Sequence, residues 1–156
     1  MAPACGALSS GVRAHRVHPY TYSASLRAEH PSADLGYLSN LFGLPTEGGW
    51  VAGEPRRTPV GKALEGTRER SYWYAKLVEK WKHSTDLDLE GAIDEWLSRI
   101  EPFNEKLAEF FCSGGELNFF ISIVGNGNLG LVLSPKLLGR LSMQRVELQL
   151  DIYPNE

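Results

Sequence analysis

An alternation of apolar and polar side chains with a period of two is the clearest pattern along the chain. It runs through residues 20–29, where the apolar side holds Tyr20, Tyr22, Ala24 and Leu26. It returns at residues 117–123 and is cleanest at residues 146–153, where the apolar side holds Val146, Leu148, Leu150 and Ile152. Successive side chains of a strand point to opposite faces of a sheet, so these segments predict three half-buried strands.

Two further extended segments lie between the first two of these strands. Residues 71–78 carry aromatic side chains on both sides of the alternation, which favours a strand. Trp50 begins a shorter extended piece between two glycine-containing turns. Residues 54–66 are rich in proline, glycine and arginine and predict a loop.

A repeat of three and four replaces the alternation from Leu89 to Phe111. This spacing places the apolar side chains on one face of a long helix, with Asp86 or Asp88 near its N-terminal cap. Pro102 lacks a backbone N–H and clashes with the preceding turn. We therefore expect Pro102 to kink or divide the helix.

Two short helices complete the helical part. Ser32 is the expected cap of a helix through residues 35–42, because a serine oxygen can accept a hydrogen bond from the free N–H groups of a first turn. Ser134 followed by Pro135 begins another short helix over residues 137–141.

The sequence Gly125-Asn126-Gly127-Asn128 is a strong hairpin signal, because glycine and asparagine tolerate positive φ. Residues 129–133 are therefore expected to return as an antiparallel strand. The resulting order is strand, helix, two strands, long helix, hairpin, short helix and strand. It predicts an α+β fold, a two-layer sandwich of a mostly antiparallel sheet of about five or six strands with one long kinked helix and two short helices. A ferredoxin-like centre satisfies the same order.

Length and composition fit one globular domain. The chain has 156 residues, of which 42% are hydrophobic and 22% charged, and a chain of this size can bury about 70% of its unfolded surface. Residues 1–19 contain arginine and histidine but no acid and no apolar run, which indicates a disordered leader, and residues 20–156 form the expected domain. Cys5 and Cys112 lie far apart and no apolar stretch could cross a bilayer, so we expect a reduced cytoplasmic protein.

The sequence carries no complete catalytic, cofactor-binding or metal-binding motif. His15 and His18 have a usable ligand spacing but lie in the expected leader, without an acid or cysteine nearby. Gly125-x-Gly127-x-x-Gly130 echoes a dinucleotide fingerprint, yet it joins two expected strands and offers no helix N-terminus to a pyrophosphate. No nucleophile elbow occurs, and neither cysteine has an activating neighbour. The sequence therefore assigns no catalytic residue, no cofactor and no metal ligand.

Acidic side chains are concentrated on the long helix. Glu101, Glu105 and Glu109 are spaced four apart, so like charges stack on one face and each pair costs roughly 0.2–0.5 kcal/mol. A solvated face is one interpretation of this pattern. The other is a docking surface for a basic protein partner, which would relieve the repulsion on binding. The second interpretation motivates our leading hypothesis, a non-enzymatic protein-interaction domain of an immunity or regulatory type.

Basic and aromatic residues mix between positions 50 and 82, as they do on platforms for single-stranded nucleic acid. Interleaved glutamates dilute that charge, and the net charge of −3 disfavours nucleic acid as a partner. A further alternative is a small-ligand or hydrolytic site on the exposed sheet, with candidate residues Trp50, Arg56, Trp73, Asp151 and Tyr153. A pocket that joins Asp151 and Tyr153 to an arginine would favour this alternative.

Several short stretches match a known pattern in order. They are Tyr22-Ser23-Ala24-Ser25-Leu26-Arg27, Leu41-Phe42-Gly43-Leu44-Pro45-Thr46, Gly53-Glu54, Ser71-Tyr72-Trp73, Asp88-Leu89-Glu90 and Leu150-Asp151-Ile152-Tyr153. Through them, residues 20–153 resemble an uncharacterised bacterial family, number 4279 of the domain-of-unknown-function series. The resemblance implies a small α+β domain and supplies no activity and no catalytic residues.

Overall fold

A computed structural model describes residues 18–154 and places β1 (Tyr20–His30) inside the sheet, with paired strands on both sides. Every second side chain of β1 is buried and those between are half-buried, as the alternation predicts. On one side β1 pairs antiparallel with β7 (Glu116–Gly125). On the other side it pairs antiparallel with β5 (Ser71–Lys76) and β6 (Lys82–His83).

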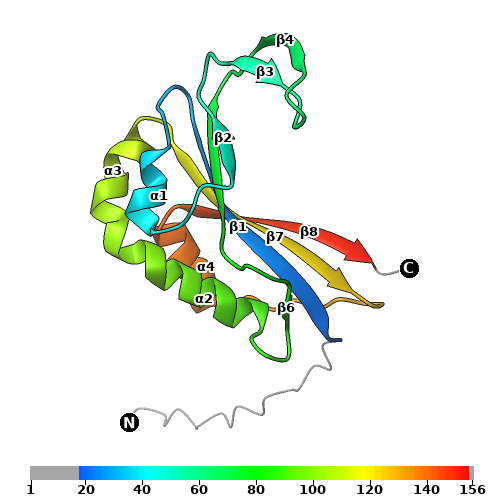
Figure 1. Ribbon diagram of the computed structural model, residues 1–156. Helices are drawn as coiled ribbons and strands as arrows, with labels where there is room; N and C mark the ends of the chain where they lie inside the picture. The colour runs from blue at the N-terminus through cyan, green and yellow to red at the C-terminus, as the bar shows by residue number, and fades with distance from the viewer. Residues whose placement is uncertain (1–17, 155–156) are drawn as a thin grey trace, which may run out of the picture.

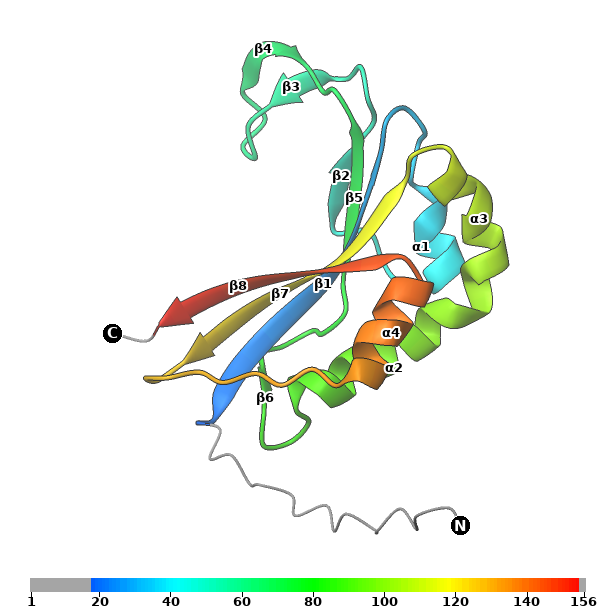
Figure 2. The ribbon, with the colours of Figure 1, turned by 180° about the vertical axis from the view of Figure 1, so that it is seen from behind.

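Helices cover one face of this sheet and leave the other face open (Figures 1 and 2). They are α1 (Tyr37–Phe42), α2 (Leu89–Ile100), the single 3₁₀ turn η1 (Glu101–Phe103), α3 (Asn104–Cys112) and α4 (Pro135–Met143). Within the described part of the chain, none of these helices combines the length and the apolar character needed to span a membrane. The expected leader lies almost wholly outside the described residues.

The sheet is mixed and open, with β2 (Gly48–Trp50) and β8 (Val146–Pro154) at its edges. Its six strands follow the order β2-β5-β1-β7-β8, with β6 beside β1. The crossover β1-α1-β2 is a split βαβ unit, since β5 lies between its two parallel strands, and this is the feature shared with a ferredoxin-like centre. The crossover β7-α4-β8 is not split, because its strands are direct neighbours. The fold class is α+β, as predicted.

The long helix begins and breaks where the sequence predicts. Asp88 Oδ1 accepts a hydrogen bond from the Gly91 N–H at 2.8 Å and so caps α2. Pro102 lies in η1, which divides the helical stretch into α2 and α3. Local chemistry alone is sufficient to explain both features.

The short helices agree less uniformly. Ser134 Oγ accepts a hydrogen bond from the Leu137 N–H at 3.2 Å and caps α4 as predicted. The first short helix starts later than predicted, because Ser32 is not its cap and Gly36 takes that position without a side-chain hydrogen bond.

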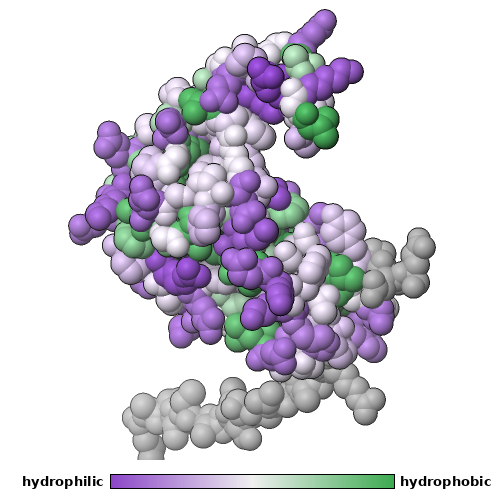
Figure 3. Space-filling model, viewed as in Figure 1, coloured by the Kyte–Doolittle hydropathy of each residue, from purple (hydrophilic) through white to green (hydrophobic). Residues whose placement is uncertain are grey.

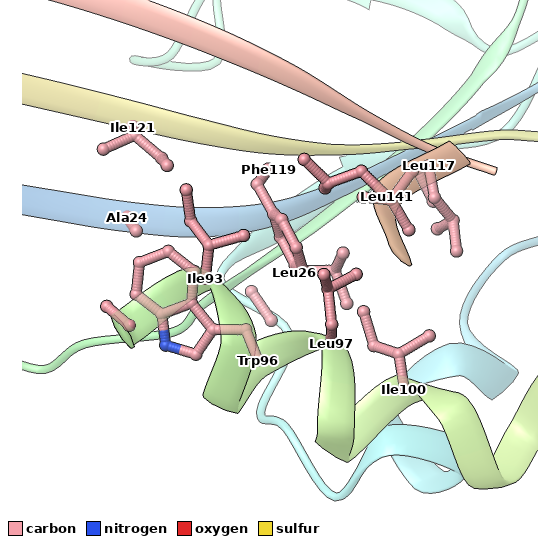
Figure 4. Packing of buried hydrophobic residues seen from close by; sticks show 14 of the residues in the cluster. Ala24, Leu26, Ile93, Trp96, Leu97, Ile100, Leu117, Phe119, Ile121 and Leu141 are labelled. Carbon is pink, nitrogen blue, oxygen red and sulfur yellow. The ribbon is translucent and has the colours of Figure 1, made fainter. Parts of the chain in front are cut away.

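Side chains of α2 pack on the buried face of β1 and β7 and form the core between the two layers (Figure 4). Trp96 of α2 meets Phe119 of β7 edge to face, with ring centroids 5.6 Å apart and an interplanar angle of 63°. Aromatic rings favour this arrangement, and burying a large apolar side chain contributes about 1.5–3 kcal/mol. The covered face of the sheet is therefore occupied by the core, whereas no described helix packs on the open face.

The connection from β7 to β8 shows that our hairpin prediction was wrong. Gly127 has a positive φ of 75°, as the turn signal suggests, but residues 129–133 are not a strand and lead instead into α4. The neighbour of β7 is β8, which runs parallel to it from Leu117 beside Val146 onward. A parallel pair needs a crossover connection and cannot be closed by a tight turn.

The segment expected to be a loop, residues 54–66, contains a hairpin. Its strands, β3 (Pro55–Arg57) and β4 (Ala63–Thr67), pair antiparallel with an irregular register and form a small sheet of their own. Every residue of both strands is exposed, so no apolar alternation could have revealed them. The hairpin precedes β5 and projects from its N-terminal end toward the open side of the main sheet (Figures 1 and 2).

Candidate functional site

The open face of the sheet is lined by the side chains that alternate with the buried positions. Arg27 of β1 lies between two such neighbours, Tyr74 of β5 and Asn118 of β7. All three side chains are half-buried although no described helix covers them. They are therefore packed against one another across the strands, as cross-strand pairs on one face are.

Three aromatic rings form a stacked series along β2 and β5. The Trp50 and Tyr72 centroids are 4.7 Å apart with an interplanar angle of 30°, and the Tyr72 and Tyr74 centroids are 5.8 Å apart. Gly48 lies opposite Tyr74, where a Cβ atom would come within 2.7 Å of the tyrosine ring. The glycine thus leaves the space that Tyr74 occupies.

Two guanidinium groups cover rings of this face. The Arg68 Cζ lies 3.8 Å from the centroid of Trp50, and the Arg27 Cζ lies 3.4 Å from the centroid of Phe120. Cation–π pairs of this kind contribute about 0.5–1 kcal/mol at exposed sites. We call the resulting surface the aromatic–arginine face and define it by Trp50, Tyr72, Tyr74, Phe120, Arg27 and Arg68.

Ion pairs and hydrogen bonds hold this face in place at one end. Arg70 lies 3.3 Å from a carboxylate oxygen of Glu29 and 3.3 Å from one of Glu116. The Trp50 Nε1–H donates to the Arg70 carbonyl oxygen at 3.0 Å. Burial raises the pKa of the Tyr72 hydroxyl, and the positive charge of Arg27 opposes that shift only in part. Tyr72 is therefore a neutral group that can both donate and accept.

A cavity of about 270 Å³ opens beside the Trp50 end of the face. Its lining comprises Trp50 and Tyr72 together with Arg56, Arg68 and Arg70, Glu29 and Glu69, and Thr67 and Ser71. Arg70 is engaged by carboxylates, whereas Arg56 and Arg68 form no ion pair within residues 18–154. Figure 3 shows the molecule hollowed between the hairpin and the main body. The cavity thus offers an anionic group an aromatic wall and two guanidinium groups whose hydrogen-bond acceptors, the Glu65 and Arg57 carbonyl oxygens, are uncharged.

Of the predicted aromatic site residues, Trp50 lies at this cavity and Trp73 does not. Trp73 is 2% exposed and faces the helices, where its Nε1–H donates to Thr46 Oγ1 at 2.9 Å. The expectation that Trp73 contributes to an exposed sheet face is therefore corrected, because neighbouring residues of a strand point to opposite faces. Arg56, also predicted, lines the cavity from the hairpin.

Asp151 and Tyr153 lie on the open face, but on β8 at the opposite edge of the sheet. The Tyr153 hydroxyl donates to Asp151 Oδ2, and this bond raises the pKa of Tyr153. No ion pair joins Asp151 to an arginine within the described residues. The structure therefore does not bring the two residues together with Trp50 and Arg56.

The predicted acidic surface is partly neutralised from within the molecule. Arg140 of α4 contacts Asp94 and lies 3.1 Å from Glu101. Its Nη2 also donates to Ser98 Oγ at 3.1 Å. Glu105 and Glu109 of α3 remain exposed. Only part of the expected like-charge surface is therefore available to a partner.

His30 and Ser113 lie at a distance that could suggest a hydrolytic pair, with Nε2 and Oγ 3.0 Å apart. However, His30 Nδ1 accepts hydrogen bonds from the backbone N–H groups of Ser32 at 3.0 Å and Ala33 at 2.8 Å. A neutral ring with both acceptor bonds on Nδ1 carries its proton on Nε2. His30 then donates to Ser113 and cannot take its proton, so this pair joins the end of β1 to the end of α3.

Sequence reasoning placed Trp50, Tyr72, Tyr74 and Arg68 in a basic and aromatic region but missed Arg27 and Phe120. Both lie on the polar side of their alternating strands, which is the signal that could have found them. Metal binding has no support from clustered His, Cys, Asp or Glu side chains in the described part. Sequence spacing could not show which of these residues meet across strands.

Comparisons with known proteins give one match. Neither a curated protein nor a solved structure matches the chain. The family model for "Domain of unknown function (DUF4279)" matches residues 18–155, which include all of the described residues and so every residue of the aromatic–arginine face. The chain therefore belongs to the DUF4279 family.

Proposed function

We propose that this protein is a non-enzymatic interaction domain that binds a protein partner on its aromatic–arginine face. The stacked series of Arg68, Trp50, Tyr72 and Tyr74 on an open sheet face is the observation that carries this proposal. Tryptophan, tyrosine and arginine are the residue types enriched at the energetic centres of protein interfaces.

Preorganisation of the face supports the proposal. Trp50 is held by its hydrogen bond to the Arg70 carbonyl, and its ring is fixed between Tyr72 and the Arg68 guanidinium. Rigid aromatic side chains lose little conformational entropy on binding, which lowers the free-energy cost of association. The guanidinium edges of Arg56 and Arg68 would then select a partner segment that carries carboxylates beside apolar side chains.

The acidic helix is the weaker of the two candidate surfaces. Arg140 already holds Asp94 and Glu101, so a basic partner would have to compete with an internal cation. Pairing with Arg140 also lowers the repulsion among these acidic side chains, and relief of that repulsion was the reason to expect a basic partner. We keep the proposal that the interaction is of a regulatory or immunity type. We now place it on the aromatic–arginine face and not on the acidic helix.

Binding to a partner captured from the organism that encodes the chain tests the proposal. Trp50→Ala and Tyr74→Ala should each weaken that binding by about tenfold or more. Trp81→Ala is the matched control, because Trp81 is exposed by 53% and lies outside the face. A triple Glu101→Gln, Glu105→Gln, Glu109→Gln variant should bind normally. Loss of binding in the triple variant, with both face variants unaffected, would refute the proposal in favour of the acidic helix.

A small anionic ligand is the second candidate, and the cavity beside Trp50 favours it. Carboxylates and phosphates that bind there should raise the melting temperature of the wild-type protein and of Arg57→Gln, whose side chain is on the hairpin but not in the cavity lining. They should not stabilise Arg56→Gln. Equal stabilisation of both variants would exclude this cavity as the binding site.

A further inference from the structure

The outer edge of β8 is a second unusual surface, separate from the aromatic–arginine face. β8 is the last strand of the main sheet and no described strand pairs with its outer side. Pairing with β7 extends without a break along all of it, from Val146 to Pro154, so the whole outer side of the strand can accept another strand. Folded proteins usually shield such an edge with a bulge, an inward charge or a covering segment.

Apolar side chains on the helix side of β8 become less covered toward its C-terminal end. Val146 is 6% exposed, Leu148 and Leu150 are half-buried, and Ile152 is 51% exposed. α4 lies beneath the beginning of the strand, and the end of the strand projects beyond it (Figure 2). The helical layer is thus too short for the strand that it covers.

The alternation of β8 restricts how a second copy could pair with it. A two-fold axis perpendicular to the sheet places the open faces of two antiparallel copies on the same side. Directly opposed side chains then point to the same face only if the axis passes through a residue of β8. An axis at Gln149 or at Asp151 sets acidic residues directly opposite each other, which is unfavourable. An axis at Leu150 opposes Leu148 with Ile152 and Gln149 with Asp151.

The axis at Leu150 also pairs the longest segment, residues 147–153, without opposing two like charges. It directs the uncovered end of each strand toward the α4 of the other copy. Leu138 and Met143 of α4 are exposed by 49% and 85%. Apolar surface that the free chain leaves in water on β8 and on α4 would thus be buried together.

We propose that two copies of this chain associate through antiparallel pairing of their β8 strands about a two-fold axis at Leu150. The sheet then continues from one copy into the other, and both open faces lie on the same side. Each interface is self-complementary, as a closed two-fold dimer requires. The proposal is independent of the partner of the aromatic–arginine face, since it involves the opposite edge of the sheet.

Sedimentation of the full chain over a wide concentration range tests the proposal. Wild type should show a reversible monomer–dimer equilibrium. Gln149 is exposed, so its substitution leaves the core intact, and the pair Gln149→Lys and Gln149→Glu changes only the sign of the added charge. Lysine would face Asp151 of the other copy and should tighten the dimer, whereas glutamate should weaken it, each by roughly three- to tenfold in Kd.

Ile152→Lys is a second test of the dimer, because it places a charge opposite Leu148 and near α4 of the other copy. It should weaken the dimer by tenfold or more, while circular dichroism and melting temperature confirm that the monomer is folded. A wild-type protein that stays monomeric at every concentration would overturn the proposal. So would equal weakening by Gln149→Lys and Gln149→Glu, which would mean that residue 149 does not face an acid.

Discussion

Arg140 should contribute measurably to stability, because it joins α4 both to Asp94 in the middle of α2 and to Glu101 at the break of the long helix. Its side chain is 20% exposed, while the side chains of Asp94 and Glu101 are 46% and 59% exposed. The hydrogen bond to Asp94 and the nearby negative charges raise the pKa of Arg140, so the cation is favoured in the folded state. Replacement by glutamine removes both ion pairs and leaves the two acids on the same surface.

The expected magnitude follows from the exposure of the partners. Half-exposed ion pairs contribute about 0.2–1 kcal/mol each, so Arg140→Gln should lower the free energy of unfolding by about 0.5–2 kcal/mol. For a chain of this size, a loss of 1 kcal/mol lowers the melting temperature by about 2–4 °C. The loss should shrink as salt is added, since ions screen charges at a protein surface.

Urea unfolding of four proteins measures this contribution. They are wild type, Arg140→Gln, Asp94→Asn and the double variant, which together give the coupling free energy of the pair. Lys136→Gln is the control, because Lys136 is exposed on the same helix and forms no ion pair within residues 18–154. A coupling of zero, or an Arg140→Gln effect no larger than that of Lys136→Gln, would refute the reasoning.

Two further predictions concern the interior. Tyr22 is fully buried and donates to the Leu87 carbonyl at 3.0 Å, and burial raises its pKa from 10.0 to about 12. Because the folded state holds this proton more tightly than the unfolded state, stability should be full below pH 10 and fall by about 2–3 kcal/mol as pH rises through 12. Tyr22→Phe should flatten that decline in alkaline urea titrations, and an unchanged slope would contradict the assignment. Gly115→Ala would place a Cβ atom 2.4 Å from the Phe110 ring and should lower the free energy of unfolding by about 1–3 kcal/mol. Gly139 lies on α4 with open space around it, so Gly139→Ala should raise the free energy of unfolding by about 0.5–1 kcal/mol. Equal effects of the two alanines would show that Phe110 moves aside.

Several elements could be predicted because their signals are local. Residues only a few positions apart in the sequence determine the alternation of β1 and β8, the cap at Asp88 and the break at Pro102. The hairpin β3–β4 has no such signal, since all of its side chains are exposed and only backbone pairing defines it. The site was partly predictable for the same reason: Trp50 stood out by composition, but its stacking on Tyr72 did not.

The sequence by itself determined which side chains share a face of each strand and where the long helix begins and divides. Only the tertiary structure decided which face the helices cover, and with it that Trp73 is core while Trp50 is at the open site. It also decided that β8 joins β7 in parallel and that Arg140 meets Asp94 across 46 residues of chain. The physical reason is that side-chain periodicity is fixed by backbone geometry within a segment, whereas pairing and coverage depend on the burial free energy of the whole fold.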